Sequence, residues 1–194
     1  MSYEIYEFSR TLISVLCCGI SVKLADDYLD SEKDALSNTF NFSNKIGKGG
    51  ILYAMLFLGL SAGFNVIIGM ALFLSSYIIG MFHDLRNIFP SHLTGFRESI
   101  LLFVLGTLLW GWNTMLFAIF FIFSIQLLDD FIDIHLDRLS GHRNYVQKLG
   151  KWESTLLFII SVLSAYYFNN LAFVPATVAT AILCAAILYC QEAK

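Results

Sequence analysis

Charged residues and prolines are scarce in this sequence. Only 14% of its 194 residues are Asp, Glu, Lys or Arg, and only two are Pro. Because a soluble domain carries roughly 25% charged residues, this composition is typical of a membrane protein instead. A net charge of −3 without a basic stripe argues against a nucleic-acid partner. The four cysteines all fall in apolar segments. We therefore expect them to be small residues of membrane helices, and not disulfide partners or metal ligands.

Long stretches of the chain lack Asp, Glu, Lys and Arg altogether. They are Ile51–Phe82, Ser99–Leu128 and Ser154–Gln191. Each exceeds the ~20 residues that one membrane-spanning helix needs. Each also has turn-forming residues near its middle, namely Gly63-Phe64-Asn65, Gly111-Trp112-Asn113 and Asn169-Asn170. With a further span from about Phe8 to Ala25, we expect an all-α transmembrane bundle of about seven spans. The stretches lack the alternation of a β-barrel.

Basic residues lie in loops that we expect to face the cytoplasm. They are Lys33, Lys45 and Lys48 after the first span, Arg86 and Arg97 between the first two hairpins, and Arg138, Arg143, Lys148 and Lys151 before the last hairpin. Lys and Arg in short loops favour the cytoplasmic side. The predicted localisation is therefore an integral, multi-pass protein of the cell membrane. The acidic start lacks the basic region of a secretory signal, so we expect the first span to be retained.

One acidic motif occurs twice in the chain. Residues 23–34 read KLADDYLDSEKD, and residues 126–137, which lie 103 positions later, read QLLDDFIDIHLD. Both copies contain Asp-Asp-x-x-Asp-x-x-x-Asp at the end of a span, before a polar loop and a hairpin. We therefore predict a single transmembrane domain over residues 1–194, built from two pseudo-repeats at about 8–97 and 98–194.

The eight motif carboxylates are candidate magnesium ligands. They are Asp26, Asp27, Asp30 and Asp34 in the first copy and Asp129, Asp130, Asp133 and Asp137 in the second. On a helix, positions i, i+3 and i+7 lie within about 60° of one another, so the last three of each copy share a face. Eight carboxylates around one cavity need cations to stay ionised, and oxygen ligands suit Mg²⁺. The alternative is that each acidic run is only the solvated end of a span.

These motifs resemble those of the UbiA superfamily of intramembrane prenyltransferases. Asp133 and Asp137 are followed by Gly141, Arg143 and Leu149-Gly150 at the offsets of that family's second motif, and the similarity covers about residues 10–190. The chain also departs from the family. It has two spans fewer than is usual there, Asp26 stands where the family usually has Asn, and a polar stretch replaces the family's basic stretch after the first motif.

The resemblance implies a reaction and its site. Mg²⁺ held by the Asp clusters would grip the diphosphate of a prenyl donor, and the prenyl group would pass to a lipophilic or aromatic acceptor inside the lipid bilayer. The implied catalytic residues are Asp27, Asp30, Asp133 and Asp137, and the implied diphosphate contacts are Lys23, Lys45, Arg86 and Arg143. Lys23 can instead pair with an aspartate, because Asp27 lies one helical turn away. A bundle with two spans missing has sides that a neighbouring copy can close, so an oligomer is compatible with the sequence.

Three other functions fit parts of the pattern. A UbiA-type membrane terpene cyclase performs the same ionisation without an acceptor. A transporter or divalent-cation channel can use an acidic repeat, although transporters usually place their sites near the membrane midplane. A non-catalytic relative would act as a membrane partner.

Overall fold

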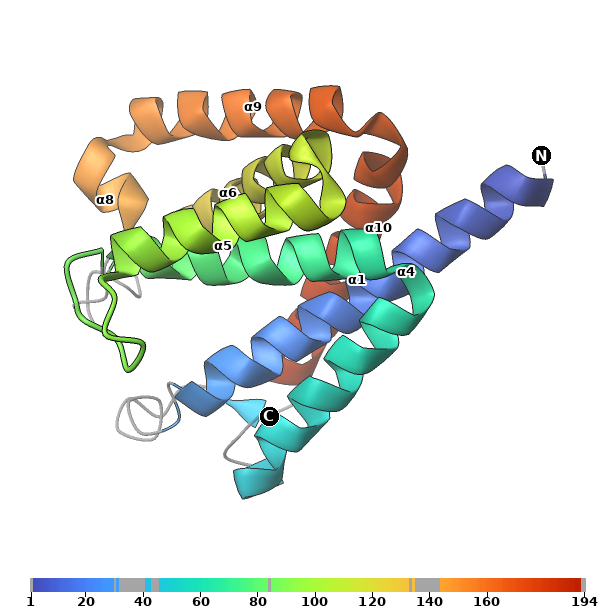
Figure 1. Cartoon of the computed structure of the whole chain (residues 1–194), viewed down its shortest axis with the longest axis horizontal. Coiled ribbons are helices and arrows are strands. Elements are labelled where there is room, and N and C mark those ends of the chain that lie inside the picture. The colour runs from blue at the N-terminus through green and yellow to red at the C-terminus, as the bar shows by residue number, and fades with distance from the viewer. Residues whose placement is uncertain are drawn as a thin grey trace. The chain divides into compact units, whose positions relative to one another are not determined.

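Helices dominate the part of the chain that the structure describes. A computed structural model describes residues 2–29, 31, 41–42, 46–83, 85–132, 134 and 144–192. Its long helices are α1 (Ser2–Leu29), α4 (Gly50–Gly80), α5 (Gly95–Trp110), α6 (Trp112–Ile132), α9 (Lys151–Phe168) and α10 (Asn170–Glu192) (Figure 1). Its short helices are η1 (Gly47–Gly49), η2 (Met81–His83) and α8 (Tyr145–Leu149). The all-α prediction is confirmed, since these residues form no strand beyond one isolated bridge.

Within the described residues, four helices are long and apolar enough to cross a membrane. They are Tyr3–Leu29, Gly50–Gly80, Trp112–Ile132 and Asn170–Cys190. The helices α5 and α9, with 16 and 18 residues, are not among these four. The described chain is therefore consistent with a membrane protein, and the number of seven spans stays a prediction.

All three predicted helix breaks occur. Asn65 interrupts α4 with φ −147° and ψ 91°, and its Oδ1 accepts a hydrogen bond of 3.3 Å from the N–H of Ile68, which caps the second half of the helix. Gly111 separates α5 from α6 at φ 88°, a conformation that favours glycine. Asn169 separates α9 from α10 at φ −155° and ψ 83°. The turn chemistry of these residues, and not their hydropathy, ends each helix.

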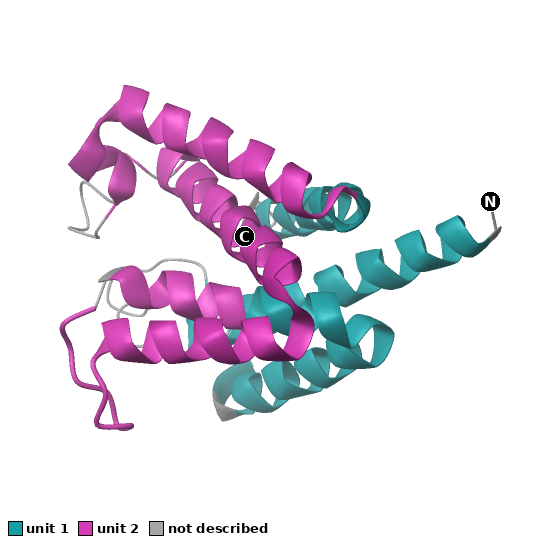
Figure 2. Ribbon diagram, turned by 45° about the horizontal axis from the view of Figure 1, so that its top comes forward, with its two compact units in different colours: residues 1–73, 171–194 teal, residues 74–170 magenta. Residues whose placement is uncertain are grey.

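The chain forms two compact units, coloured separately in Figure 2. Unit 1 comprises Met1–Phe73 and Leu171–Lys194, and unit 2 comprises Leu74–Asn170. In unit 1, small side chains bring α1 close to α4. Ser14 Oγ donates to the carbonyl of Ser61 at 2.9 Å, and Ser61 Oγ donates to the carbonyl of Ser14 at 2.8 Å. This reciprocal pair satisfies both buried hydroxyls, which an apolar setting requires.

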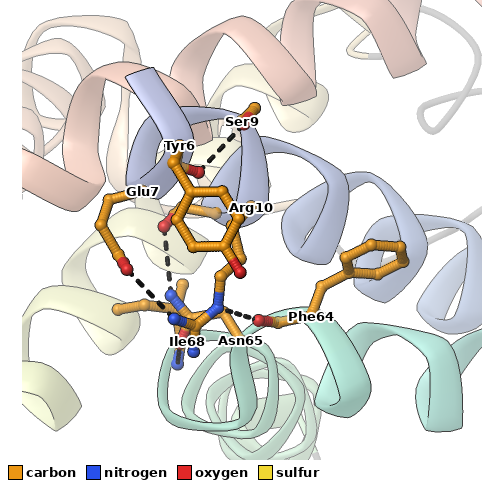
Figure 3. A network of polar contacts seen from close by, with 8 residues as sticks. Tyr6, Glu7, Ser9, Arg10, Phe64, Asn65 and Ile68 are labelled. Atoms are coloured by element: carbon orange, nitrogen blue, oxygen red, sulfur yellow. Dashed lines mark hydrogen bonds and ion pairs between the residues drawn. The ribbon is translucent and has the colours of Figure 1, made fainter. Parts of the chain in front are cut away.

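A polar network joins the start of α1 to the break in α4 (Figure 3). The guanidinium of Arg10 donates to the carbonyl of Phe64 and pairs with Glu7 at 3.1 Å. Asn65 Nδ2 donates to Thr11 Oγ1 at 3.1 Å. The network therefore supplies a partner for the Phe64 carbonyl, which lies beside the break.

In unit 2, α9 packs along α6, and α5 and α8 also contact α6. Phe120 of α6 stacks on Phe168 of α9 with ring centroids 5.9 Å apart. Asn144 begins α8 as its N-cap and accepts a hydrogen bond from the N–H of Gln147 at 3.2 Å. These contacts place α8 beside α6, the helix whose last turn carries Asp130.

Alanine at Gly69 should destabilise unit 1. A Cβ there would meet Ser61 Oγ and lie 2.9 Å from Ser14 Oγ and 3.3 Å from the Ser61 carbonyl, all held by the serine pair. We expect a loss of about 1–3 kcal/mol in the free energy of unfolding, measured by denaturant titration in micelles. The matched control is Gly59→Ala in the same helix, where a Cβ meets nothing within 4 Å. Equal stability of the two variants would contradict the close packing of α1 on α4.

Candidate functional site

The second aspartate of the first motif is buried and fully engaged. Asp27 lies in the last turn of α1 and is 3% exposed. Its Oδ1 is 2.9 Å from Lys23 Nζ, and its Oδ2 accepts a hydrogen bond of 2.9 Å from the N–H of Phe42. Its main-chain carbonyl accepts from Asn41 Nδ2 at 2.7 Å. Asp27 therefore fastens the chain at residues 41–42 to the end of α1.

The second copy makes the same set of contacts at the equivalent positions. Asp130 lies near the end of α6 and is 4% exposed. Its Oδ1 accepts from Gln126 Nε2 at 3.3 Å, and its Oδ2 accepts from the N–H of Tyr145 at 2.7 Å. Its carbonyl accepts from Asn144 Nδ2 at 2.7 Å. In each copy the partners are the side chain four residues earlier and the two residues 14 and 15 positions later.

The two copies differ in the charge of one partner. Lys23 makes an ion pair with Asp27, whereas Gln126 offers Asp130 a neutral amide. The pairing of Lys23 with an aspartate, one of its two predicted roles, is therefore confirmed. A hydrogen bond to a charged group is worth roughly 1.5–3 kcal/mol, so these contacts are strong enough to fix the loop ends.

The two adjacent aspartates of each motif lie on different sides of their helix. Asp27 and Asp130 are buried, whereas Asp26 and Asp129, the residues just before them, are exposed. Successive residues of a helix differ by about 100° around its axis, which accounts for the alternation.

Several predicted site residues lie outside the part of the chain that the structure describes. They are Asp30, Asp34, Asp133, Asp137, Lys45 and Arg143. Arg86 is exposed in the loop between η2 and α5, beside Leu85, whose carbonyl accepts from the N–H of Phe96 at 3.1 Å. Within the described ranges, no group of three or more His, Cys, Asp or Glu residues is arranged to hold a metal ion. The donor chemistry of the motifs, carboxylate oxygen only, nevertheless fits Mg²⁺.

Sequence reasoning missed the partners of the two buried aspartates. Asn41-Phe42 and Asn144-Tyr145 lie 103 positions apart, as do the motifs themselves. The same spacing relates Gly47, at φ 67°, to Gly150, at φ 103°. Extending the comparison of the two copies beyond the aspartates would have found these residues.

An apolar pocket of about 570 Å³ lies in unit 2 next to the second motif. Its lining residues are Ile78, Phe82, Leu85, Phe96, Ser99, Ile100, Phe103, Ile119 and Tyr145. Tyr145 links the pocket to the acidic helix end, since its backbone N–H is bound to Asp130. Its ring also packs edge-on against Phe123, with centroids 6.1 Å apart. Burial, and to a lesser degree the charge of Asp130, raises the pKa of Tyr145, so its phenol stays protonated at neutral pH.

Comparisons with known proteins identify no relative of this chain. Neither a family model, nor a curated protein, nor a solved structure matches the chain. The resemblance to the UbiA superfamily therefore rests on the motif residues and their spacing.

Proposed function

We propose that this protein is a Mg²⁺-dependent intramembrane prenyltransferase of the UbiA type. It would transfer a prenyl group from a polyprenyl diphosphate to a lipophilic or aromatic acceptor. One observation carries the proposal: the apolar pocket of unit 2 includes Tyr145, whose N–H is bound to Asp130 of the second motif. An isoprenoid diphosphate has an apolar tail and an anionic head, so it needs an apolar cavity and a cation-binding helix end that adjoin.

The pocket has the size and lining that a prenyl chain requires. Its volume of about 570 Å³ falls within the ~300–1,000 Å³ of small-molecule sites. Three phenylalanine rings line it, from Phe82, Phe96 and Phe103, together with Tyr145. Aromatic rings attract a cation through their faces, and an apolar wall keeps water from the allylic cation. Both effects favour transfer of the prenyl group over its hydrolysis.

The acidic helix ends would serve the leaving group. When the carbon–oxygen bond of the donor breaks, its electron pair stays on the diphosphate. Mg²⁺ bound by the motif aspartates would supply charge neutralisation there. Arg86, Arg143 and Lys45 are the proposed contacts to phosphate oxygens, because positive charge placed where negative charge develops lowers the barrier. The acceptor then bonds to the allylic carbon and releases a proton to the diphosphate or to water.

The proposal also covers how the chain is arranged in the membrane. It comprises seven spans, two structural repeats and motif loops on the cytoplasmic side. Two observations support the repeats. Asp27 and Asp130 make the same contacts, and the breaks at Asn65 and Asn169 have similar backbone angles.

The test is incubation of the purified protein with Mg²⁺ and labelled geranyl, farnesyl or geranylgeranyl diphosphate, without an acceptor. We expect release of inorganic diphosphate that stops when a chelator removes the metal. Product analysis then distinguishes the prenyltransferase from the terpene cyclase. A cyclase yields a cyclic hydrocarbon, whereas a transferase without its acceptor yields the prenyl alcohol. Absence of binding and of turnover with all three donors would contradict the proposal. Mg²⁺ flux into liposomes without turnover would favour the transport alternative.

A further inference from the structure

A second pocket lies in unit 1, where the start of α1 meets the break in α4. We infer that it binds the headgroup of a membrane phospholipid, with the phosphodiester on Arg10 and a primary ammonium, such as that of ethanolamine, on Glu7. The proposed prenyl pocket is lined by residues of unit 2 alone. The two pockets therefore share no residue, and lipid binding at Arg10 does not depend on the proposed reaction.

The lining of this pocket is polar near the start of α1 and apolar one turn further along. Its volume is about 450 Å³, and its lining residues are Tyr6, Ser9, Arg10, Ile13, Gly63 and Phe64. Ile13 lies three residues beyond Arg10 and therefore on the same side of α1. Gly63 contributes no side chain, and a Cβ there would meet nothing within 4 Å. The pocket therefore suits a ligand that is charged at one end and apolar at the other.

The guanidinium of Arg10 has more N–H donors than partners. It carries five N–H groups. Among the described residues, its Nε donates to the carbonyl of Phe64 and its Nη1 donates to Glu7 Oε1 at 3.1 Å. Figure 3 shows the guanidinium between these two acceptors. The two contacts fix the plane of the guanidinium, and its remaining N–H groups can bind the paired oxygens of a phosphodiester.

The carboxylate of Glu7 decides which kind of phosphate ligand the pocket favours. Glu7 Oε1 accepts from Arg10, and the side chain is 36% exposed. Because Arg10 and Glu7 together carry no net charge, the pair does not favour a ligand with negative charge alone. A zwitterionic headgroup matches both residues, since its phosphate accepts from Arg10 and its ammonium donates to Glu7. A choline headgroup has the same net charge but no N–H donor, so it cannot make the second contact.

The position of Arg10 along α1 corresponds to the depth of a lipid headgroup. The helix is long and apolar enough to cross a membrane. The 17 positions from Arg10 to Asp27 correspond to about 26 Å of helix, which is close to the ~30 Å of the hydrocarbon core. Tyr3 and Tyr6 are exposed in the first turns of α1, and tyrosine is enriched at membrane–water interfaces. If Asp27 lies at one interface, Arg10 therefore lies near the other, at the level of the lipid phosphates.

Native mass spectrometry of the full-length protein in detergent micelles tests this site, with phosphatidylethanolamine, phosphatidylcholine and phosphatidylglycerol of identical acyl chains. We expect phosphatidylethanolamine to bind about tenfold or more tightly than phosphatidylcholine, the factor for one hydrogen bond to a charged group. In Glu7→Gln this preference should fall below about threefold, because a neutral amide forms no ion pair with the ammonium. In Arg10→Gln the affinity for phosphatidylethanolamine should fall about tenfold or more, although the new amide can still donate to the carbonyl of Phe64.

Gly63→Leu tests the pocket without changing a charge or a contact of Arg10. Its side chain would occupy the pocket, so the affinity for phosphatidylethanolamine should fall by a similar factor. The matched control is Gly59→Leu, one turn earlier on α4, because Gly59 does not line the pocket and a Cβ there also meets nothing within 4 Å. This control should bind as the wild type does.

The outcomes separate the lipid headgroup from other ligands. Equal binding of phosphatidylethanolamine to the two leucine variants would overturn the site, even where Arg10→Gln fails to fold. Tighter binding of phosphatidylglycerol than of phosphatidylethanolamine by the wild type would overturn the zwitterionic headgroup. Free phosphoethanolamine is the soluble arm of the experiment, and its binding as tightly as the lipid would overturn the membrane as the source of the ligand.

Discussion

Alanine at Asp129 should lower the rate of Mg²⁺-dependent diphosphate release about 100- to 1,000-fold. That factor is the usual loss when stabilisation of developing negative charge is removed, and Asp129 would provide such stabilisation by holding the Mg²⁺. Asp129 is exposed at the end of α6, next to the buried Asp130, whose carboxylate binds the N–H of Tyr145 in the pocket wall. The measurement is labelled diphosphate release at saturating donor, over a range of Mg²⁺ concentrations. The variant should need a higher Mg²⁺ concentration for half of its maximal rate.

The matched control for this experiment is Glu4→Ala. Glu4 is an exposed carboxylate in the first turn of α1, whereas Asp26 lies near the last turn of the same helix. The 22 positions from Glu4 to Asp26 correspond to about 33 Å of helix, so the control removes one negative charge far from the first motif. We expect unchanged turnover for Glu4→Ala and an intermediate loss for Asp26→Ala. Equal rates for Asp129→Ala and Glu4→Ala would show that the acidic helix ends are only solvated termini.

The sequence predicted the helical class and the positions of the breaks because both depend on local chemistry. An uncharged stretch longer than one span has to be helical in a membrane, and Asn and Gly near the middle of such a stretch have the turn chemistry that ends a helix. Asn65, Gly111 and Asn169 each end a helix where the sequence predicted it. The number of spans is harder to predict, because it depends on whether each helix that a break leaves is still long enough to cross the membrane. With 16 residues, α5 is shorter than the ~20 that cross a bilayer unaided.

The contacts of Asp27 with Asn41 and Phe42 were not predicted, because these residues are distant from Asp27 in sequence. Helix spacing relates Asp27 to Lys23, one turn earlier, and that pair was among the expected alternatives. No local rule relates Asp27 to Phe42, since the path of the loop decides that contact. Spacing on a helical wheel also placed Asp27 on the same face as Asp30 and Asp34, without saying which face is buried. Burial is a property of packing, and it separates Asp26 from Asp27 although the two residues are adjacent.

Tryptophan at Ile119 should block the prenyl pocket and lower kcat/KM for farnesyl diphosphate by about a thousandfold. Ile119 of α6 lines the pocket, and an indole there would take the space of one isoprene unit. Burying five carbon groups contributes roughly 4 kcal/mol at about 0.8 kcal/mol each, and each 1.4 kcal/mol corresponds to about a factor of ten. The loss should be smaller for geranyl diphosphate, whose tail is one unit shorter. Steady-state kinetics with both donors measures the difference.

The control for the pocket is Leu128→Trp on the same helix, because Leu128 is 44% exposed and does not line the pocket. It adds the same bulky side chain to α6 without filling the cavity, so kcat/KM for both donors should change by less than about threefold. The Mg²⁺ concentration for half of the maximal rate should be the same in both tryptophan variants, since neither substitution replaces an aspartate. A loss in Ile119→Trp that is equal for both donors would point to a disturbed fold. An undiminished rate with farnesyl diphosphate would mean that the prenyl chain binds elsewhere, which would remove the observation on which the proposed function rests.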